Sequence, residues 1–456
     1  MGAQINPEEL KRILVGPDEH VDKEQFIIVH YRLVPSPGYT VTDAAARICL
    51  TTTLRTMRRL PYEQSSARLE AMGRVLSAKD TGTVTIAYPL NICSEKEGIT
   101  QLFVIIAFGV DYGYTDAYWV DDIELPRSLL KRFRGPRFGI DGLRRLFALP
   151  EVGGTKNRRR EAYSGEKERS SNIPVRPLIG VSIKPRRGVP LTEIAEACSE
   201  SLRGGADFIV DDLLLVDPDG EMAFEKRVPV LATIAHDASL GQPKLYFANV
   251  STSPFRALEL AKRAKAEGVD GLVVNAFAMG FSALDELADS VGLPIITTNM
   301  GDGLLTRPNQ PTGISAAVIS KLSRLAGADA IHAGTSSSEC FGPEAWSSAI
   351  LSFRSGFHQL LPGCFAVAEG DITIADVWDN IYSLGPDVML EACSGILEYP
   401  GGPFKGAQAF RTLVENLSHR MSLDEAHNKI MEIADRDPIV RQGLDYYNYQ
   451  PKLDTP

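Results

Sequence analysis

The sequence predicts an α/β protein in which an N-terminal α+β domain precedes a (β/α)8 barrel of the TIM type. Two observations support this. From Arg176 onward, a short apolar run is followed by a helical pattern, and this unit recurs eight times within about 240 residues. Before that point, strand and helix patterns are mixed without such a rhythm, which is typical of an α+β fold. An open doubly wound sheet is the alternative, but no G-x-G-x-x-G follows the first strand of the repeat.

The N-terminal domain is expected to span residues 1–150 and to be ferredoxin-like. Its strand patterns are rich in β-branched or aromatic residues, alternate in polarity, or are continuously apolar, whereas the remaining segments have a helical pattern. The predicted strands are residues 25–34, 83–89 and 101–109, and the predicted helices are residues 43–59, 126–134 and 139–147.

Residues 151–175 separate the two regions and are predicted to form a charged linker or loop. The segment Gly153–Asn172 is nearly free of apolar residues and dense in charge, Gly and Ser. Its arginine triplet, Arg158–Arg160, could form an anion-binding or nucleic-acid-binding patch. We prefer a solvated linker, because a segment of this composition cannot bury a core.

The barrel domain is expected to span residues 176–440, followed by a tail at residues 441–456. Glycines occur where its helices should end. One helical segment places Ile314, Val318 and Leu322 on a single face at steps of four. The predicted strands are residues 178–184, 206–211, 244–250, 271–276, 294–298, 330–334, 364–369 and 388–393, and the predicted helices include residues 191–203, 254–266 and 314–325.

Composition excludes several classes of function. Asp and Glu number 58 against 48 Lys and Arg, a formal net charge of −10, and we expect no nucleic-acid surface in so acidic a chain. No apolar run approaches the length of about 18–20 residues that a membrane helix needs, and the start has no signal-peptide core, so we expect a cytoplasmic protein. The six Cys form no C-x-x-C pair and show no zinc-type spacing.

The chemistry of such a barrel lies at the carboxyl ends of its strands, here called the barrel mouth. Lys184 directly follows an apolar strand, so it should project at the mouth and carry protons if loss of hydration lowers its pKa. A structural ion pair with Asp211 or Asp212 is the alternative. Further candidates at strand ends are Asp212, Asn275, Thr298, Asn299, Glu339, Glu369 and Asp371.

Several roles remain open for these candidates. Asp212 could accept a hydrogen bond, bind a metal ion or balance the charge of Lys184. Asn275, Thr298 and Asn299 could contact a substrate or only satisfy the strand ends.

Three carboxylates, Glu339, Glu369 and Asp371, would form an acidic rim at adjacent strand ends, although surface carboxylates are usually solvated. His332 lies inside a predicted strand, and we interpret it as packed rather than catalytic. No H-E-x-x-H motif, facial triad, Ser-His-Asp arrangement or G-x-S-x-G elbow is present.

Several segments resemble the large chain of RuBisCO. Arg176–Gly188 (RPLIGVSIKPRRG) and Ser201–Asp212 (SLRGGADFIVDD) are similar to the first two barrel strands of that family. The resemblance implies an N-terminal α+β domain, a (β/α)8 barrel, a small-molecule substrate and a homodimer whose active site lies at the subunit interface. Weaker similarities follow in the family's order at Tyr88–Leu90, Phe133–Gly139, Tyr246–Ser251, Arg324–Thr335 and Tyr399–Ala407.

At the end of the second barrel strand the chain departs from the family pattern. Carboxylases of this family have K-D-D-E there, and a carbamylated Lys, an Asp and a Glu hold Mg²⁺. Here the run is Val210-Asp211-Asp212-Leu213, so Asp212 is the only retained ligand position. A hard divalent ion takes several oxygen ligands. The resemblance therefore implies that the usual Mg²⁺ site is absent or very weak, and we expect no other cofactor.

The resemblance also assigns the remaining site positions. Lys184 matches the family's lysine that moves protons in enolisation, and Arg186 replaces a second lysine. Elsewhere the family's cationic or backbone phosphate donors are lost at both phosphate sites, and carboxylates appear at one of them. The positions concerned are Thr298-Asn299, Ser315, Glu339, Glu369-Gly370-Asp371 and Cys393-Ser394-Gly395.

We therefore expect a RuBisCO-like protein of the non-carboxylating kind (form IV) that acts as a lyase or isomerase. Lys184 would transfer a proton next to a carbonyl group of a small sugar-derived substrate, which Asn275, Thr298 and Asn299 would orient. The acidic rim would favour a neutral or amine-bearing substrate over a bisphosphate. A non-catalytic dimeric binding or regulatory scaffold is the alternative, and a Mg²⁺-dependent carboxylase is a remote one.

Overall fold

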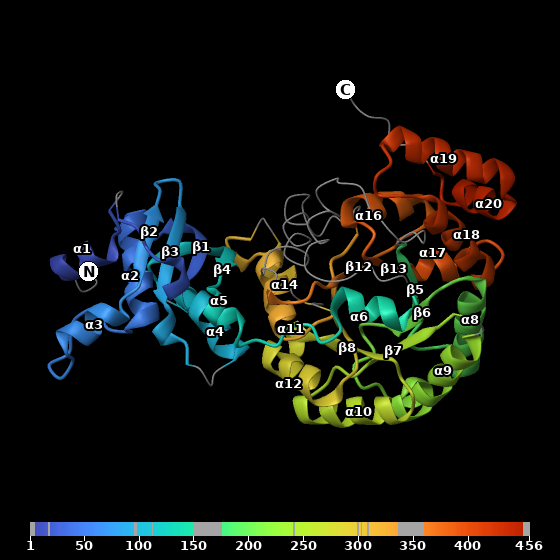
Figure 1. Cartoon of the computed structure of the whole chain (residues 1–456), viewed down its shortest axis with the longest axis horizontal. Coiled ribbons are helices and arrows are strands. Elements are labelled where there is room, and N and C mark those ends of the chain that lie inside the picture. Colours follow the sequence, from blue (N-terminus) through green and yellow to red (C-terminus); the bar gives the residue numbers. More distant parts are fainter. Residues whose placement is uncertain are drawn as a thin grey trace.

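The computed structural model shows two bodies side by side (Figure 1), with the N-terminal elements in blue and cyan and a barrel wrapped by helices beside them. The predicted linker, residues 151–175, and its arginine triplet lie outside the described residues. The structure describes residues 5–16, 19–94, 98–111, 113–149, 176–239, 242–298, 301, 303–307, 310–335 and 360–449.

The N-terminal domain is built on a mixed sheet. Its strands are β1 (Phe26–Pro35), β2 (Arg74–Ala78), β3 (Thr83–Pro89), β4 (Thr115–Glu124) and β10 (Thr312–Ile314). Within the described residues, these five strands lie in the order β10-β4-β1-β3-β2. Pairing is antiparallel except for β10, which runs parallel to β4. The order β4-β1-β3-β2 is that of a ferredoxin-like fold, which confirms the predicted fold class.

Helix α2 (Val41–Thr53) packs against β1, β2 and β3. It begins at a capping box, in which the Thr40 side chain accepts from the backbone of Asp43 and the Asp43 carboxylate accepts from the backbone of Thr40. The other helices of this domain are α1 (Pro7–Ile13), α3 (Ser65–Ala71), α4 (Ile99–Ala107) and α5 (Arg127–Leu130), with 3-10 turns at Lys23–Gln25, Leu90–Ile92 and Phe108–Asp111.

The prediction of a strand at residues 101–109 is wrong, because this segment forms α4. Periodicity alone does not separate a short continuous apolar run in a strand from the same run in a buried helix. In the structure Ile99, Leu102 and Ile106 are buried at steps of three and four, the spacing of one helix face. Strands β2 and β4 were not among the predicted elements.

The barrel closes, within the described residues, through eight parallel strands in the order β11-β12-β13-β5-β6-β7-β8-β9. All eight correspond to predicted strands. Their bounds are β5 (Leu178–Ile183), β6 (Phe208–Asp211), β7 (Leu245–Asn249), β8 (Gly271–Asn275), β9 (Ile295–Thr298), β11 (Ala330–His332), β12 (Phe365–Glu369) and β13 (Val388–Glu391).

Helices surround the barrel and form an outer layer (Figure 1). Outward-facing strand residues such as Ile179 and Val181 share one apolar cluster with these helices. The helices are α8 (Leu191–Gly204), α9 (Phe224–Ala238), α10 (Pro254–Ala266), α11 (Ala276–Met279), α12 (Phe281–Val291), α13 (Gly303–Thr306), α14 (Ala316–Leu325), α16 (Val377–Leu384), α17 (Cys393–Leu397), α18 (Pro403–Asn416), α19 (Leu423–Arg436) and α20 (Pro438–Tyr446), with 3-10 turns at Gly220–Met222 and Ile374–Asp376.

The amino end of the barrel, opposite the mouth, is covered by α6 (Gly139–Leu146). Leu143 of this helix and Phe147 pack into the apolar barrel interior. The ring centroid of Phe147 lies 6.0 Å from that of Phe208, an inward-facing residue of β6. Because side chains fill the interior from this end, the barrel is a packed core rather than a pore.

A Gly-x-Asp tripeptide precedes four of the barrel strands at this amino end. The carboxylates of Asp207, Asp270 and Asp329 each accept a backbone N–H from the preceding barrel strand at 2.9–3.0 Å. The fourth, Asp387, forms an ion pair with Arg144 of α6. These aspartates therefore tie neighbouring strands together, or a strand to the helix that covers the barrel end.

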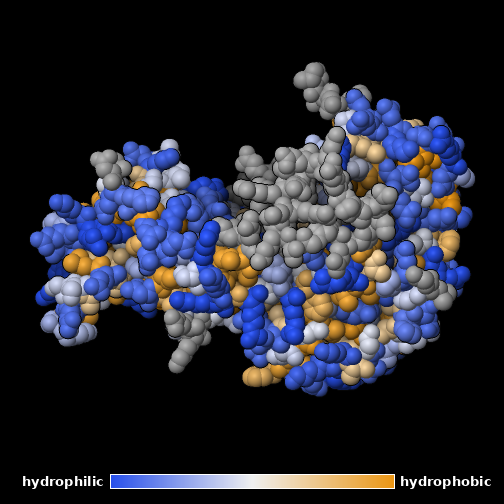
Figure 2. Space-filling view, in the orientation of Figure 1, coloured by the Kyte–Doolittle hydropathy of each residue, from blue (hydrophilic) through white to orange (hydrophobic). Residues whose placement is uncertain are grey.

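The N-terminal domain and the barrel meet along β4, β10 and α14. Ser315, at the start of α14, donates its hydroxyl to the carbonyl oxygen of Asp121 at 2.6 Å, and the Lys321 ammonium donates to the carbonyl oxygen of Ile123 at 3.0 Å. Hydrophobic residues gather between the two bodies and over the middle of the barrel, and hydrophilic residues cover α19 (Figure 2). No helix among the described residues is long and apolar enough to cross a membrane.

Candidate active site

Strand alternation determines which side chains face the interior at the barrel mouth. On β12, Phe365 and Val367 belong to the interior apolar cluster, so the next alternate position, Glu369, faces inward as well. The same counting on the neighbouring strands β11 and β13 turns His332 and Glu391 inward. Glu369 and Glu391 are direct partners in the register of β12 and β13. Three adjacent strands thus direct one imidazole and two carboxylates to one place.

The other five strands contribute polar residues by the same alternation. The interior cluster contains inward-facing residues of β5, β6, β7, β8 and β9, and the alternate positions that follow at or just beyond the strand ends are polar. These positions are Lys184, Asp212, Asn249, Asn275 and Thr298.

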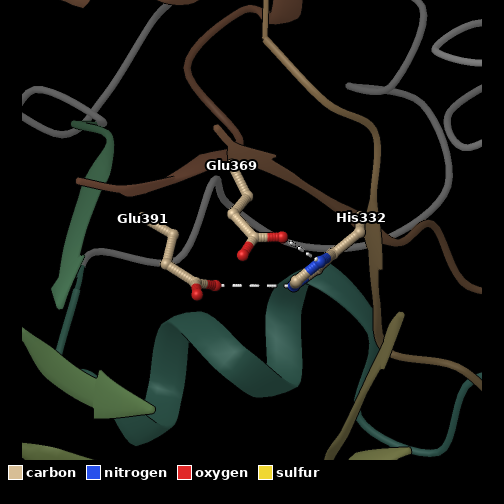
Figure 3. A group of neighbouring side chains, drawn as sticks. All are labelled: His332, Glu369 and Glu391. Atoms are coloured by element: carbon tan, nitrogen blue, oxygen red, sulfur yellow. Dashed lines mark ion pairs between the residues drawn. The ribbon is translucent and has the colours of Figure 1, made fainter. Parts of the chain in front are cut away.

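His332, Glu369 and Glu391 form a compact cluster, and their side chains point toward one another (Figure 3). His332 Nδ1 lies 2.9 Å from Glu369 Oε2, and His332 Nε2 lies 3.4 Å from Glu391 Oε2. The side chain of Glu391 is 0% exposed, whereas that of Glu369 is 19% exposed. The cluster therefore extends from the buried interior to the barrel mouth.

The pKa values of the cluster follow from the burial of charged groups close to one another. Burial alone would lower the pKa of His332, but the charges of the two glutamates outweigh it and raise the pKa to about 10. Burial, together with the negative charge of Glu369, raises the pKa of Glu391. For Glu369 burial acts in the same upward direction, but the charge of His332 prevails and the pKa is lowered.

Lys184 stands beside this cluster and half exposed. Its Nζ lies 3.9 Å from Asp212 Oδ2. Burial alone would lower the pKa of Lys184, but acidic groups around it, Glu369 and Asp212 among them, outweigh this effect, so the pKa is raised. We expected Lys184 to carry protons if loss of hydration lowered its pKa. The structure gives the opposite shift, because acidic groups gather around the ammonium at the mouth.

Asp211 and Asp212 are adjacent in sequence but face opposite ways. Asp211 lies behind the barrel wall and accepts hydrogen bonds from Arg227 at 2.8 Å and from Tyr246 at 2.8 Å. Asp212 faces the mouth, and its Oδ1 accepts the backbone N–H of Leu214 at 2.8 Å. Burial is the main cause of the raised pKa of Asp212. Asp211 is thus a structural residue, while Asp212 has an oxygen available beside Lys184.

The neutral candidates are buried at the strand ends. Asn275 is 7% exposed and caps α11 by accepting the backbone N–H of Ala278 at 2.9 Å. Thr298 is 1% exposed at the end of β9. Asn299 and Glu339, two further candidates, lie outside the described residues.

The remaining candidates are less closely grouped with Lys184. Arg186 is exposed and donates to the carbonyl oxygen of Leu214 at 3.5 Å. The hydroxyl of Ser394 is 3.5 Å from the Asp371 carboxylate. Gly395 is buried in α17, where an added Cβ would meet the carbonyl oxygen of Ile372 at 2.1 Å, so close packing requires a glycine.

Ser315 occupies a different position from the mouth candidates. Besides its bond to the N-terminal domain, its side chain accepts the backbone N–H of Val318 at 3.2 Å and so caps α14. Both hydrogen-bonding functions of this hydroxyl are therefore used by the structure.

Sequence reasoning missed Glu391 and assigned His332 to packing. The signal that would have found both is alternation in the paired strands. Val367 and Met389 are inward and in register, so their second neighbours Glu369 and Glu391 must be inward and in register too. His332 is buried as expected, but between two carboxylates rather than among apolar side chains.

This arrangement can perform two kinds of chemistry. A protonated lysine beside a carboxylate can exchange protons with a substrate that enters the mouth. An imidazole and two carboxylates that converge can hold a cation. The described residues at the mouth also offer neutral hydrogen-bonding groups on strands β8 and β9, where they can orient a polar substrate.

Comparisons with known proteins agree with this architecture. The family model described as "Ribulose bisphosphate carboxylase large chain, catalytic domain" matches residues 166–436, and that of the corresponding N-terminal domain matches residues 17–129. A ribulose bisphosphate carboxylase of Thermococcus onnurineus is 28% identical over 443 residues, covering 91% of this chain and 93% of the relative. A ribulose bisphosphate carboxylase-like protein of Archaeoglobus fulgidus is 28% identical over 434 residues, covering 90% of each.

Two solved structures have the same fold. The octameric ribulose-1,5-bisphosphate carboxylase/oxygenase of Pyrococcus horikoshii superposes with a TM-score of 0.81 at 23% identity, covering 97% of this chain and 99% of that one. The dimeric archaeal Rubisco of Hyperthermus butylicus superposes with a TM-score of 0.80 at 22% identity, covering 97% and 100%. At this identity the likeness establishes the fold alone.

Proposed function

The chain belongs to the ribulose bisphosphate carboxylase large-chain family, and from this premise we propose that it is a RuBisCO-like protein of the non-carboxylating kind (form IV). Its reaction is that of a lyase or isomerase, in which Lys184 transfers a proton next to a carbonyl group of a small sugar-derived substrate. The observation that carries this proposal is the position of the Lys184 ammonium at the barrel mouth, 3.9 Å from the Asp212 carboxylate.

The Mg²⁺ position that the family implies does not fit the residues present. The residue that stands where carboxylases have the carbamylated lysine is Val210, which is 0% exposed and packs in the apolar barrel interior. Leu213 belongs to the same apolar cluster. Only Asp212 could offer an oxygen there, and a hard cation needs several. We derive no step through an ion at this position.

The charge of the mouth argues against a bisphosphate substrate. Glu369 is among the few candidates at the mouth that are both inward-facing and ionised, and its pKa is lowered by His332. Phosphate groups near such carboxylates would meet like charge at short range, where repulsion is strong because water is excluded. A neutral or amine-bearing sugar derivative suits this environment better.

The charge state of Lys184 favours a lyase reaction over an isomerase reaction. Because the surrounding carboxylates raise its pKa, the ammonium is the form that meets the substrate, so its first step is donation. When an amine-bearing β-keto acid, whose ammonium group offsets its carboxylate, loses carbon dioxide, the electron pair of the broken C–C bond forms an enolate. Lys184 then gives its proton to the enolate carbon and is reprotonated from solvent. Asp212 stabilises the ammonium before the step.

We further propose a homodimer with the active site at the subunit interface. Support comes from two solved relatives, of which one is described as dimeric and the other as octameric.

The experiment begins with a thermal-shift screen of sugar acids, amino sugars and sugar phosphates. A ligand at one hundred times its Kd stabilises the folded chain by about 2.7 kcal/mol, which is readily visible. Compounds that bind are then incubated in D2O, and NMR follows deuterium at the carbon next to the carbonyl. We expect Lys184→Ala to abolish deuterium incorporation while the ligand still binds.

The matched control is Lys226→Ala, because Lys226 is an exposed lysine whose ion-pair partner among the described residues is Glu221 at the surface. Its exchange rate should equal that of the wild type. Unchanged exchange in Lys184→Ala would refute the mechanism, and no ligand response at all would favour the non-catalytic scaffold. Incorporation of labelled carbon dioxide with ribulose 1,5-bisphosphate would instead revive the carboxylase, and we expect none.

A further inference from the structure

The cluster of His332, Glu369 and Glu391 is built by the barrel rather than by chance contact of surface chains. Each residue occupies the inward position at the carboxyl end of its strand, and the three strands are adjacent. One ligand atom from each residue can be chosen so that all three lie within 4.8 Å of one another. The backbone of three paired strands therefore fixes the arrangement.

The buried part of this cluster is not satisfied by hydrogen bonds. Within the part of the chain that the structure describes, neither ring nitrogen of His332 and neither carboxylate oxygen of Glu391 has a hydrogen-bond partner, although the ion-pair contacts are short. The ring N–H groups are thus not aimed at the carboxylates. Among the described residues, no Lys or Arg lies within 4.0 Å of either glutamate. A buried carboxylate left this way costs about 1–3 kcal/mol or more, which a bound cation would offset.

The ligand atoms lie close enough together for one metal ion. Two ligands with bonds of about 2.1 Å lie about 3.0 Å apart at right angles and about 3.4 Å apart at a tetrahedral angle. The two N···O contacts involve opposite ring nitrogens, Nδ1 with Glu369 at 2.9 Å and Nε2 with Glu391 at 3.4 Å. One ion would bind only one of these nitrogens, and one atom from each residue can be chosen so that the three lie within 4.8 Å of one another. A side-chain rotation of the part-exposed Glu369 can bring its oxygen onto the ion.

We propose that His332, Glu369 and Glu391 bind one first-row divalent transition-metal ion at the barrel mouth. One ring nitrogen and two carboxylates suit Mn²⁺, Co²⁺ or Zn²⁺, whereas Mg²⁺ and Ca²⁺ prefer oxygen ligands alone.

The site lies beside Lys184, so a bound ion could take part in the proposed reaction. Three protein ligands leave coordination positions open, and Glu369 is the ligand that reaches the solvent-facing side. An ion there would polarise a carbonyl oxygen of the substrate. This role rests on the proposed function, but the binding of the ion does not.

The test uses the full chain, stripped with a chelator and dialysed, with no substrate present. Mn²⁺, Co²⁺ and Zn²⁺ are titrated separately by calorimetry, and the absorption spectrum of the Co²⁺ form reports its ligands. We expect one ion per chain. Glu391→Gln and Glu369→Gln should each weaken binding by at least about 100-fold. Circular dichroism shows whether each variant is folded, and Glu369→Gln, at the part-exposed edge, serves if Glu391→Gln fails to fold.

The control is Asp212→Asn, which removes the carboxylate at the family's usual metal position. Its affinity should stay within about threefold of the wild type. Absence of stoichiometric binding by all three ions would overturn the proposal, as would unchanged affinity in both glutamine variants. Loss of binding in Asp212→Asn alone would place the ion elsewhere and overturn it too. Lys184→Ala should bind the ion normally, so failure of the proposed reaction is distinguishable from failure of this site.

Discussion

The two ends of the barrel treat buried charge in opposite ways. At the amino end, Asp207 is held by Arg176 at 2.9 Å and by Arg411 at 2.7 Å, and it also accepts a backbone N–H. At the mouth, the oxygens of Glu391 accept no hydrogen bond from any described residue, and His332 donates none to one. The same strands run between these ends. The amino end is therefore arranged for stability, and the mouth retains groups that can bind a substrate or an ion.

This difference predicts how substitutions at each end change the free energy of unfolding. A buried charge with good partners is costly to disrupt, because its partners are left without compensation. A buried charge without hydrogen bonds is already costly, and its removal can relieve the fold. Substitutions at the two ends should therefore change stability in opposite directions.

The largest effect is expected at the amino end. Asp207→Asn should lower the free energy of unfolding by about 3–5 kcal/mol, because Arg176 and Arg411 lose the carboxylate between them. Urea denaturation followed by circular dichroism measures it. Asp237→Asn, on an exposed position of α9, is the control and should change stability by less than about 0.5 kcal/mol. Equal effects of both variants would break the comparison.

The next effect is a pH dependence that originates at the mouth. The pKa of His332 is raised from 6.5 to about 10, so the folded chain holds a proton that the unfolded chain releases. Stability from this group is complete below pH 6.5 and is lost as pH rises toward 10, by an amount on the order of 5 kcal/mol. The difference between wild type and His332→Gln in urea midpoints across this window reports it. Parallel curves would contradict the assignment.

A smaller effect of opposite sign is expected from Glu391→Gln. The amide keeps the shape of the side chain but removes a buried charge that accepts no hydrogen bond. In metal-free buffer the free energy of unfolding should stay level or rise by about 1 kcal/mol. Chemical denaturation beside Asp207→Asn sharpens the contrast between the two ends. A loss above about 2 kcal/mol would mean that the carboxylate stabilises the empty fold.

The smallest effect is expected where neither end is involved. Lys226 and Glu221 form an exposed ion pair at 3.0 Å, with side chains 53% and 61% exposed. Lys226→Ala should change stability by less than about 0.5 kcal/mol, and added salt should reduce even that. Thermal unfolding at low and high ionic strength checks this. A larger change would show that surface charge, rather than position along the barrel axis, governs stability here.

The barrel was predictable because of how its strands are buried. A parallel strand covered on both faces is a short apolar run, and the helix that follows has its own period, so the alternation of the two is visible in sequence. The N-terminal domain was harder. The apolar run at residues 101–109 has no period that separates helix from strand, and in the structure it packs as α4, with contacts to α12 and α14.

The candidate site was predictable only in part. Lys184 and Asp212 were found because they end their strands, and the structure turns both toward the mouth. Glu391 was missed because the predicted strand continued to Cys393, and candidates were taken from the end of that strand. Glu391 lies two residues before that end. The pairing of His332 with two glutamates depends on which strands are neighbours in the closed barrel, and sequence distance does not reveal that.

Strand β10 has a consequence for how the chain is made. Thr312–Ile314 completes the N-terminal sheet beside β4, yet roughly 190 residues separate the two strands along the chain. A ribosome adding about 5–20 residues per second needs on the order of ten seconds or more to supply β10 after β4 has emerged. During that interval the edge of β4 is unpaired, so nascent chains can pair wrongly with one another. Cells that make few chains at a time, or that supply chaperones, should therefore recover more of the protein.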